Sequence, residues 1–416
     1  MNEEAHQQPD VLVIGGGPAG LAAAVQLKQL GCGNVVVIER EKVAGGIPRH
    51  CFHTGFGIRD LKRIISGPKY AANYVHLAGN AGVTLLTEAT AIAWKDDLAI
   101  QVTSPQGIQM FAPKAVLLAT GCRERPRSAR FIPGDRPAGV YTTAALQQLV
   151  YLQSQKVGSR AVVVGAEHVS FSAVATLAAA GCKTIGILTE HPHHQTYRPF
   201  HWWVAGRKRI PVHTECKVVG IQGKGRVESI EYLDLQTKQS HAIECDTVVF
   251  TGDWIPDNEF ARLGNLEINE WTDGPEVDQC LCTSRPGVFA AGNLLRGAEM
   301  ADTAAAEGRY AARQIATYLE NQKWFAEHSR IRIVPISPVK WVSPNTINPE
   351  GPGSLPESQL VFRVDRFLGK SKVQLLGDSS VIAERTFRRL VPNHWYGLRF
   401  QFRNFDFKEL AVRVED

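Results

Sequence analysis

Three glycines near the N-terminus have the spacing of a phosphate-binding loop. Gly15, Gly17 and Gly20 form a GxGxxG pattern within VLVIGGGPAG, after a short apolar run and before the helix-forming run LAAAVQLKQL. Such glycines permit a tight turn, close approach of backbone to a pyrophosphate, and close packing of helix on strand. An acid, Glu39, ends the next apolar run, 24 residues after Gly15, where it can meet ribose hydroxyls. We predict a bound dinucleotide, the alternative being a glycine-rich structural turn.

The same pattern recurs 150 residues later with different residues in the loop. Without a gap, this offset aligns Gly15 with Gly165, Leu27 with Leu177, and Gly31-Cys32 with Gly181-Cys182. An internal repeat of this kind predicts a second strand, turn, helix and strand. Its chemistry differs, because Glu167 stands in place of Gly17, Ser170 in place of Gly20, and Thr189 in place of Glu39.

Two further segments, AVLLATG (residues 115–121) and PGVFAAGN (residues 286–293), are apolar runs that end in small residues. Together with GGGPAG and the pair Gly45-Gly46, they resemble the flavoproteins with two dinucleotide-binding domains, the pyridine nucleotide-disulfide oxidoreductase-like superfamily, over residues 10–320. This resemblance implies FAD in the first domain and NAD(P)H in the second. It implies FAD contacts from Gly15, Gly17, Pro18, Ala19, Gly20, Glu39, Arg40, Gly45, Gly46, Ile47, Ala91, Thr120, Gly121, Gly292, Asn293, Thr303 and Ala304. Asn293 stands where the family has an acid.

Glu167 is expected to affect nucleotide binding at the second loop. A glutamate at the second glycine position brings a side chain and a negative charge to the place of a pyrophosphate. Two like charges about 4 Å apart at an intermediate dielectric cost on the order of 4 kcal/mol, roughly three decades of affinity. Alternatively, Glu167 points away and Glu190 supplies the ribose contact. We expect no ordinary NAD(P) site here.

Residues near the expected flavin suggest little thiol chemistry. The segment GGIPRHCFHTGFG contains Cys51 without the second cysteine of a redox pair, so we expect no disulfide reduction. Cys51 and His53 are the candidate catalytic residues, with the histidine moving a proton during hydride transfer. The alternative is that Cys51 is a small buried hydrophobe and His53 a hydrogen-bonded core residue. A helix from Met300, capped by Asp302 or Thr303, is expected to aim its positive end at the flavin, as in the family.

Metal binding is not expected. His191, His193, His194 and His201 cluster in a proline-interrupted loop, but no carboxylate or cysteine follows at ligand spacing. Cys280 and Cys282 are two residues apart; if they lay in a strand, they would share one face and be too far apart for an easy disulfide.

Composition excludes other classes of function. The 416 residues carry a net charge of only +5, which gives no case for nucleic-acid binding, and no apolar run reaches the ~20 residues of a transmembrane helix. The N-terminus does not have the pattern of a signal peptide. Eight cysteines at irregular spacing indicate reduced thiols and a cytoplasmic protein.

We therefore predict an α/β protein with two Rossmann-like dinucleotide-binding domains and a small C-terminal β domain. The FAD domain is expected to span 1–150 and 256–325, an NAD(P)-like domain with a degenerate loop 151–255, and the β domain 326–416. In the β domain, RIRIVPI, QLVFRVD, KVQLLG and LRFQFRNF alternate like strands. The basic and aromatic run RTFRRLVPNHWYGLRFQFRNF (residues 385–405) is either a solvated sheet face or a docking surface for a partner or an anionic membrane.

Within the superfamily, the segments 45–57 and 119–147 and the helix ADTAAAEG resemble the FAD subunits of multi-subunit dehydrogenases and oxidases acting on hydroxyproline, sarcosine or proline, and companions of glycerol 3-phosphate dehydrogenases. This resemblance implies a flavin subunit that passes electrons from a small amino acid or hydroxy compound to a non-nicotinamide acceptor. It also implies a partner subunit or homo-oligomer. The alternatives are an NAD(P)H-dependent flavin reductase and an electron-relay or assembly subunit without substrate chemistry.

Overall fold

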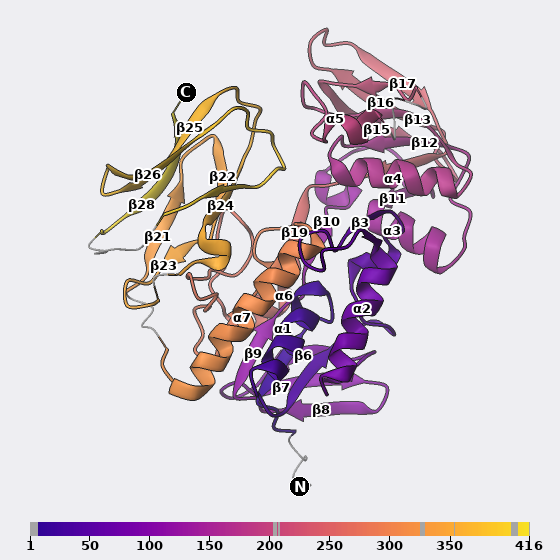
Figure 1. Cartoon of the computed structure of the whole chain (residues 1–416). Helices are drawn as coiled ribbons and strands as arrows, with labels where there is room; N and C mark the ends of the chain where they lie inside the picture. Colours follow the sequence, from indigo (N-terminus) through magenta and orange to yellow (C-terminus); the bar gives the residue numbers. More distant parts are fainter. Residues whose placement is uncertain are drawn as a thin grey trace. The chain divides into compact units, whose positions relative to one another are not determined.

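The computed structural model describes residues 7–202, 206, 209–324, 329–352, 354–400 and 407–415. The chain divides into two compact units. Unit 1 comprises residues 1–49, 54–122 and 256–416, and unit 2 comprises residues 50–53 and 123–255. The chain passes between the units through two short paired strands, β10 (Cys122–Glu124) and β19 (Trp254–Pro256) (Figure 1). Apart from residues 50–53, unit 2 is one continuous segment, 123–255.

Unit 1 is built on a parallel sheet in the order β20-β9-β1-β2-β5. Its strands are β1 (Val11–Ile14), β2 (Val35–Ile38), β5 (Thr84–Leu86), β9 (Ala115–Leu118) and β20 (Val288–Ala290). Every residue of β1, β2 and β9 is buried, as expected for a parallel sheet covered on both faces. The main helices are α1 (Pro18–Gln29), α2 (Gly67–Asn80) and α7 (Ala301–Asn321).

Helices α1 and α7 pack tightly because a glycine lies between them. A Cβ on Gly308 of α7 would lie 2.0 Å from the Ala19 carbonyl oxygen of α1. The remaining elements of unit 1 up to β20 are short. They are η1 (Ile47–His50), whose last residue belongs to unit 2, β3 (Thr54–Phe56), β4 (Ile65–Ser66), β6 (Thr90–Trp94), β7 (Ile100–Ser104), β8 (Gly107–Phe111) and α6 (Glu259–Leu263). A 3-10 turn, η5 (Gly292–Leu294), follows β20.

Unit 2 repeats the same architecture. Its parallel sheet has the order β11-β18-β12-β13-β14. The strands are β11 (Val140–Thr142), β12 (Arg160–Val164), β13 (Lys183–Leu188), β14 (Val212–His213) and β18 (Thr247–Phe250). The helices are η2 (Arg127–Arg130), α3 (Thr143–Gln147), η3 (Gln148–Leu152), α4 (His168–Ala179) and α5 (Arg198–His201). An antiparallel sheet of β15 (Cys216–Gln222), β16 (Ser229–Asp234) and β17 (Ser240–Glu244) completes it. The predicted α/β class with two Rossmann-like sheets is confirmed.

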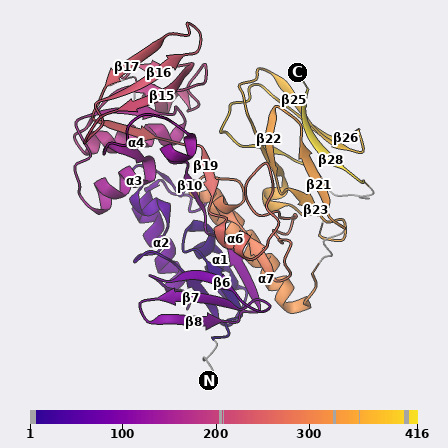
Figure 2. The ribbon, with the colours of Figure 1, turned by 180° about the vertical axis from the view of Figure 1, so that it is seen from behind.

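The C-terminal part of unit 1 is all β, with two sheets that are visible from behind in Figure 2. One sheet has the order β23-β21-β28-β25-β26 and the other β22-β24-β27. Their bounds are β21 (Ile331–Pro335), β22 (Val339–Ser343), β23 (Thr346–Ile347), β24 (Leu360–Val364), β25 (Ser371–Gly377), β26 (Ser380–Phe387), β27 (Tyr396–Leu398) and β28 (Leu410–Glu415), with a 3-10 turn η7 (Pro356–Ser358). Strands β21, β24 and β25 fall on three of the four expected segments. Of the fourth segment, only Leu398 falls in a strand, β27, and residues 401–405 lie outside the described chain.

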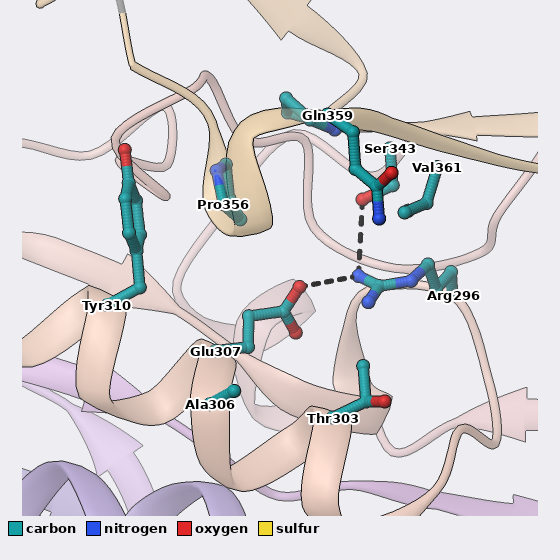
Figure 3. Close-up of a pocket in the computed structure, with 10 residues that line it drawn as sticks. Arg296, Thr303, Ala306, Glu307, Tyr310, Ser343, Pro356, Gln359 and Val361 are labelled. Carbon is teal, nitrogen blue, oxygen red and sulfur yellow. Dashed lines mark hydrogen bonds and ion pairs between the residues drawn. The ribbon is translucent and has the colours of Figure 1, made fainter. Parts of the chain in front are cut away.

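Buried ion pairs join this β part to the rest of unit 1. Arg296 pairs with Glu307 of α7 at 2.9 Å and donates to Ser343 Oγ of β22 at 3.2 Å, beside a cavity of about 30 Å³ (Figure 3). Arg363 of β24 pairs with Glu299 at 2.6 Å. All four of these charged side chains are at most 8% exposed. The β part and the α7 region therefore share a charged interior.

Candidate dinucleotide sites

The first glycine loop has a backbone that other residues cannot adopt without strain. Gly15 has φ +113°, and a Cβ there would lie 2.3 Å from the Ala119 carbonyl oxygen of the neighbouring strand. A Cβ on Gly20 would lie 1.9 Å from the Gly15 carbonyl oxygen. Both glycines are thus required by the turn and by helix-on-strand packing, as their spacing predicts.

Gly17, between these two glycines in the sequence, has free space on the side where a Cβ would lie. Gly17 is the N-cap residue of α1, and no side chain caps that helix. A Cβ on Gly17 would meet nothing nearer than Gly46 Cα at 4.0 Å, whereas a Cβ on Gly46 would lie 2.9 Å from Gly17 Cα. Pro18 and Ala19 form the first turn of α1. The free N–H groups and the two facing glycines fit an anionic pyrophosphate.

The acid predicted to meet a ribose is fixed at the end of β2. Glu39 is buried, and its two carboxylate oxygens accept from the backbone N–H groups of Gly16 (3.1 Å) and Glu41 (2.8 Å). Burial raises the pKa of Glu39. Beside it, Arg40 is exposed and forms an ion pair with Asp257 at 3.5 Å. An open hollow next to Glu39 is lined by Arg40, Glu41, Lys42, Glu88, Thr90, Thr103, Ser104 and Pro105. Ala91 follows Thr90 in β6.

The remaining predicted cofactor contacts come from the ends of neighbouring strands and from α7. Thr120 Oγ1 donates to the Asp257 carbonyl oxygen at 2.7 Å, and the Gly121 carbonyl oxygen accepts from Asp257 N–H at 2.9 Å. After β20, Gly292 has φ +78°, and a Cβ there would lie 2.7 Å from Ala19 Cβ. Asn293 Oδ1 accepts from Glu299 N–H at 3.1 Å.

Sequence reasoning missed Glu307, which holds the turn after β20. Its Oε2 accepts from Gly292 N–H at 2.8 Å while its Oε1 pairs with Arg296. Fifteen residues separate Glu307 from Gly292, and no local motif connects them.

The expected cap of α7 was wrong. The helix begins after Met300, the N-cap residue, and no side chain caps it. Asp302 instead accepts from the backbone N–H groups of Gly57 and Arg59, each at 2.8 Å. Thr303 and Ala304 lie buried in the first turn. The carboxylate therefore ties a distant loop to the start of α7.

The repeat extends to individual backbone hydrogen bonds. Gly15 N–H donates to Ile38 O at 2.9 Å, and Gly165 N–H donates to Leu188 O at 2.8 Å. Likewise, Gly45 N–H donates to Gly16 O at 2.7 Å, and Gln195 N–H donates to Ala166 O at 2.8 Å. The 150-residue offset thus holds at both bonds. The glycine pair Gly45-Gly46 corresponds to Gln195-Thr196, which are both buried.

In unit 2, side chains of the protein fill the space beside Glu167, the residue equivalent to Gly17. The Glu167 carboxylate accepts from Ser170 N–H and from Thr251 Oγ1 (2.8 Å), and Ser170 Oγ accepts from Glu167 N–H (3.2 Å). These are reciprocal caps of α4. Thr196 Oγ1 lies 2.5 Å from His168 Nδ1. The carboxylate thus binds a helix N-terminus that its counterpart in unit 1 leaves uncapped. Burial raises the pKa of Glu167. Thr189 accepts from His191 N–H at 3.3 Å, while Glu190 is exposed.

The candidate catalytic cysteine belongs to a buried polar cluster in unit 2. Cys51 Sγ donates to Gln147 Oε1 at 3.3 Å, and His50 Nδ1 lies 3.2 Å from the same oxygen. Burial and the nearby Glu124 raise the pKa of Cys51 to about 12, so its thiol stays protonated. Burial also raises the pKa of Glu124 to about 7. His53 is half-buried. Gln147 and Glu124 were not found from sequence, because they are about 96 and 73 residues from Cys51.

The described residues include no group of three or more potential ligands that could hold a metal ion. His194 and His201 stack with ring centroids 4.2 Å apart. All eight cysteines are free thiols. Cys280 and Cys282 are both buried. Cys280 lies in a turn and Cys282 forms an isolated β-bridge with Phe289. The N–H groups of Cys280 (2.8 Å) and Cys282 (3.1 Å) both donate to Asp278 Oδ1. Across the described chain, no helix is long and apolar enough to cross a membrane.

Comparison with known proteins agrees with this architecture. The model of the family described as pyridine nucleotide-disulphide oxidoreductase matches residues 9–308. One subunit of opine oxidase from Agrobacterium tumefaciens (strain Ach5) is 26% identical over 73% of this chain, which spans 64% of that protein's length. Ferredoxin–NADP reductase of Ignicoccus hospitalis is 26% identical, covering 76% of this chain and 99% of that protein. Thioredoxin reductase of T. acidophilum shares the fold, with a TM-score of 0.63 at 21% identity, over 75% of this chain and 99% of that chain.

Proposed function

The chain belongs to the FAD-dependent pyridine nucleotide-disulphide oxidoreductase family, and we propose that it passes electrons from a small amino acid or hydroxy compound to an acceptor other than NAD(P). We further propose that it works in the cytoplasm as the flavin subunit of a larger dehydrogenase or oxidase, of the kind that acts on hydroxyproline, sarcosine, proline or glycerol 3-phosphate. One relative, a subunit of opine oxidase, supports this assignment.

One observation carries the proposal. Side chains fill the second loop where the first loop is open, because Glu167 caps α4 and Gln195 and Thr196 replace the glycine pair. A pyrophosphate entering this loop would have to displace a carboxylate already bound to the helix N-terminus. It would also meet that carboxylate's charge.

The first loop would hold FAD, whose isoalloxazine ring accepts a hydride from substrate when the cofactor is bound. Gly17 and Gly46 would let the backbone approach the pyrophosphate, and the uncapped N-terminus of α1 would bind its charge. Glu39 would accept from a ribose hydroxyl, and Glu307 would position the Gly292 turn. The first turn of α7, with Thr303 and Ala304, would direct the positive end of its dipole towards the flavin.

A second candidate is an NAD(P)H-dependent reductase. Its support is the name of the Ignicoccus relative, ferredoxin–NADP reductase, which matches this chain along 99% of its own length. An electron-relay subunit without substrate chemistry is a third candidate, supported by the opine oxidase relative, which is itself part of a larger enzyme. A reductase must bind a nicotinamide dinucleotide, whereas a relay subunit must stay oxidised until a second chain is present.

The test is an anaerobic reduction screen. The purified protein is expected to be yellow and to release FAD on denaturation. Mixed anaerobically with single compounds, including proline, hydroxyproline, sarcosine and glycerol 3-phosphate, the flavin absorbance near 450 nm should fall with one of these classes. Reduction by none of them until a second chain is added would favour the relay function. A colourless protein that takes up no FAD would contradict all three candidates.

A further inference from the structure

We propose that an exposed basic surface of unit 1 docks an acidic one-electron carrier protein, which takes the electrons that leave the flavin. This inference rests on the proposed function, because it identifies the chemistry of the non-nicotinamide acceptor. The surface, called here the basic surface, comprises Ile58, Arg59, Lys62, Arg63 and Ile64 of one loop and Arg388, Arg389, Trp395 and Arg399 of the β part.

The loop presents cations and apolar side chains but no exposed carboxylate. Arg59, Lys62 and Arg63 are exposed, and Ile64 and Ile58 are 72% and 51% exposed. The only acid between residues 54 and 66 is Asp60, whose side chain is 2% exposed and forms an ion pair with Arg309 at 2.6 Å. The charge of Asp60 is thus neutralised inside the protein, and the outer face of the loop is positive.

Two carboxylates hold this loop in one conformation. Asp302 accepts from the backbone N–H groups of Gly57 and Arg59, and Asp60 accepts from the hydroxyl groups of Tyr70 and Tyr74. A loop fixed in this way loses little conformational entropy when a partner binds. Asp302 also belongs to the first turn of α7, next to the predicted flavin contacts Thr303 and Ala304. The basic surface therefore lies beside the proposed flavin site.

The positive surface continues onto the β part through one contact. The Arg59 guanidinium lies over the Trp395 ring, 5.3 Å from its centroid. The segment around Trp395 carries Arg388, Arg389 and Arg399, which are exposed, and no acidic residue occurs between positions 385 and 399. Six exposed cations therefore occur in two segments that meet at the Arg59–Trp395 contact. The net charge of the whole chain is only +5.

This combination fits an acidic protein partner. A positive patch raises the encounter rate with a negatively charged partner, and exposed isoleucines supply the apolar contact that a docked protein buries. In the reaction, two carrier molecules each take one electron from the reduced flavin, which returns to its oxidised state, and one proton is released to solvent. A negatively charged partner that docks on the basic surface would bring its redox centre close to the flavin, which shortens the distance for electron transfer.

The test uses rubredoxin, an acidic one-electron protein, and cytochrome c, a basic one. The variant R59E/K62E/R63E reverses the charge of the loop. The control K217E/K224E/K238E changes three exposed lysines on or near the β15–β17 sheet of unit 2. The flavin is photoreduced anaerobically, so that no organic substrate is needed. Its reoxidation by each protein is followed at low and high salt, and rubredoxin binding to the oxidised protein is measured by calorimetry.

We expect the loop variant to slow reoxidation by rubredoxin at low salt about tenfold or more and to weaken rubredoxin binding by a similar factor. Reoxidation by the uncharged acceptor p-benzoquinone should not change, and the control variant should behave like wild type. The proposal is overturned if wild type and the loop variant bind rubredoxin equally, or if cytochrome c is the preferred protein acceptor. It is also overturned if the loop variant loses binding to phosphatidylserine vesicles but not to rubredoxin. Failure of the substrate screen would leave these binding results unaffected.

Discussion

At the scale of single residues, Gly17 and Glu167 distinguish the two loops. Both residues are N-caps at equivalent positions of the repeat, and both have extended backbone geometry. The difference is that the glutamate uses its carboxylate to cap its own helix. A helix N-terminus binds one anion readily, so an internal carboxylate and an external phosphate compete for the same N–H groups.

Copying this difference into the first loop gives the first prediction. The variant Gly17→Glu should fold normally, because the backbone angles suit any residue and a carboxylate can cap α1. It should lose bound FAD, measured as the ratio of absorbance at 450 nm to that at 280 nm. Gly17→Ala adds a Cβ that meets nothing within 4 Å except Gly46 Cα, and it should retain most of the FAD. Full flavin content in Gly17→Glu would show that the pyrophosphate does not lie at this loop.

Glu124 gives a prediction about pH. Burial raises its pKa from an ordinary value of 4.5 to about 7, so the folded protein holds this proton more tightly than the unfolded chain. The stability that Glu124 contributes is therefore complete below pH 4.5 and is lost as the pH rises to about 7. The variant Glu124→Gln should gain stability over wild type across this range, by up to about 3 kcal/mol above pH 7.

Urea unfolding at several pH values measures this gain, since other titrating groups affect both proteins alike. The exposed Glu244→Gln serves as the control. A stability difference between Glu124→Gln and wild type that does not vary between pH 4.5 and 8 would show that Glu124 ionises normally.

At the scale of elements, the sequence predicts those features that a local pattern dictates. Apolar runs and glycine spacing predict the strand, turn and helix of each parallel sheet. In the first loop this works because a Cβ on Gly15 or Gly20 would lie within 2.3 Å of a backbone atom, so only glycine fits there. The 150-residue repeat can be recognised in the sequence for the same reason. Contacts between distant segments cannot be predicted from local sequence patterns. Asp302 was expected to cap its own helix, but it binds N–H groups about 245 residues away, and nothing local distinguishes the two roles.

Likewise, the sequence predicts that Glu167 disfavours nucleotide binding, but it does not predict that the Glu167 carboxylate caps α4. The cap requires Ser170 and Thr251 to lie beside it, and Thr251 is 84 residues away. The covering residues Gln195 and Thr196 occupy the place of a glycine pair only because the repeat continues past β13. That continuation is visible in the hydrogen bonds and not in the residue types.

The loop held by Asp302 gives an element-scale prediction. Asp302→Ala removes both acceptors for the N–H groups of Gly57 and Arg59, so the loop should open more often. Limited trypsin digestion should cut after Arg59, Lys62 or Arg63 several-fold faster than in wild type. Cutting after the exposed Lys238 of unit 2 should not change. If cutting in the loop is not faster, other contacts hold its conformation.

At the scale of the whole molecule, the β part is joined to the rest of unit 1 by buried charges. Arg363→Met would leave Glu299 buried without its partner at 2.6 Å, a change that costs about 3–5 kcal/mol. The double variant Arg363→Met/Glu299→Gln should recover part of this loss. Arg366→Met breaks an exposed pair with Asp365 and should cost less than about 1 kcal/mol. Equal unfolding free energies for Arg363→Met and Arg366→Met would show that the buried pair does not hold the β part in place.

We propose that this oxidoreductase does not use NAD(P), because side chains of the protein fill its second nucleotide loop. Anaerobic stopped-flow mixing with NADH and, separately, NADPH at micromolar concentrations tests this claim most directly, with the flavin absorbance followed near 450 nm. We predict that neither dinucleotide bleaches the flavin within minutes, whereas dithionite reduces it fully. Rapid bleaching by either nicotinamide would show that the second loop binds it despite Glu167, and would make the protein an NAD(P)H-dependent reductase.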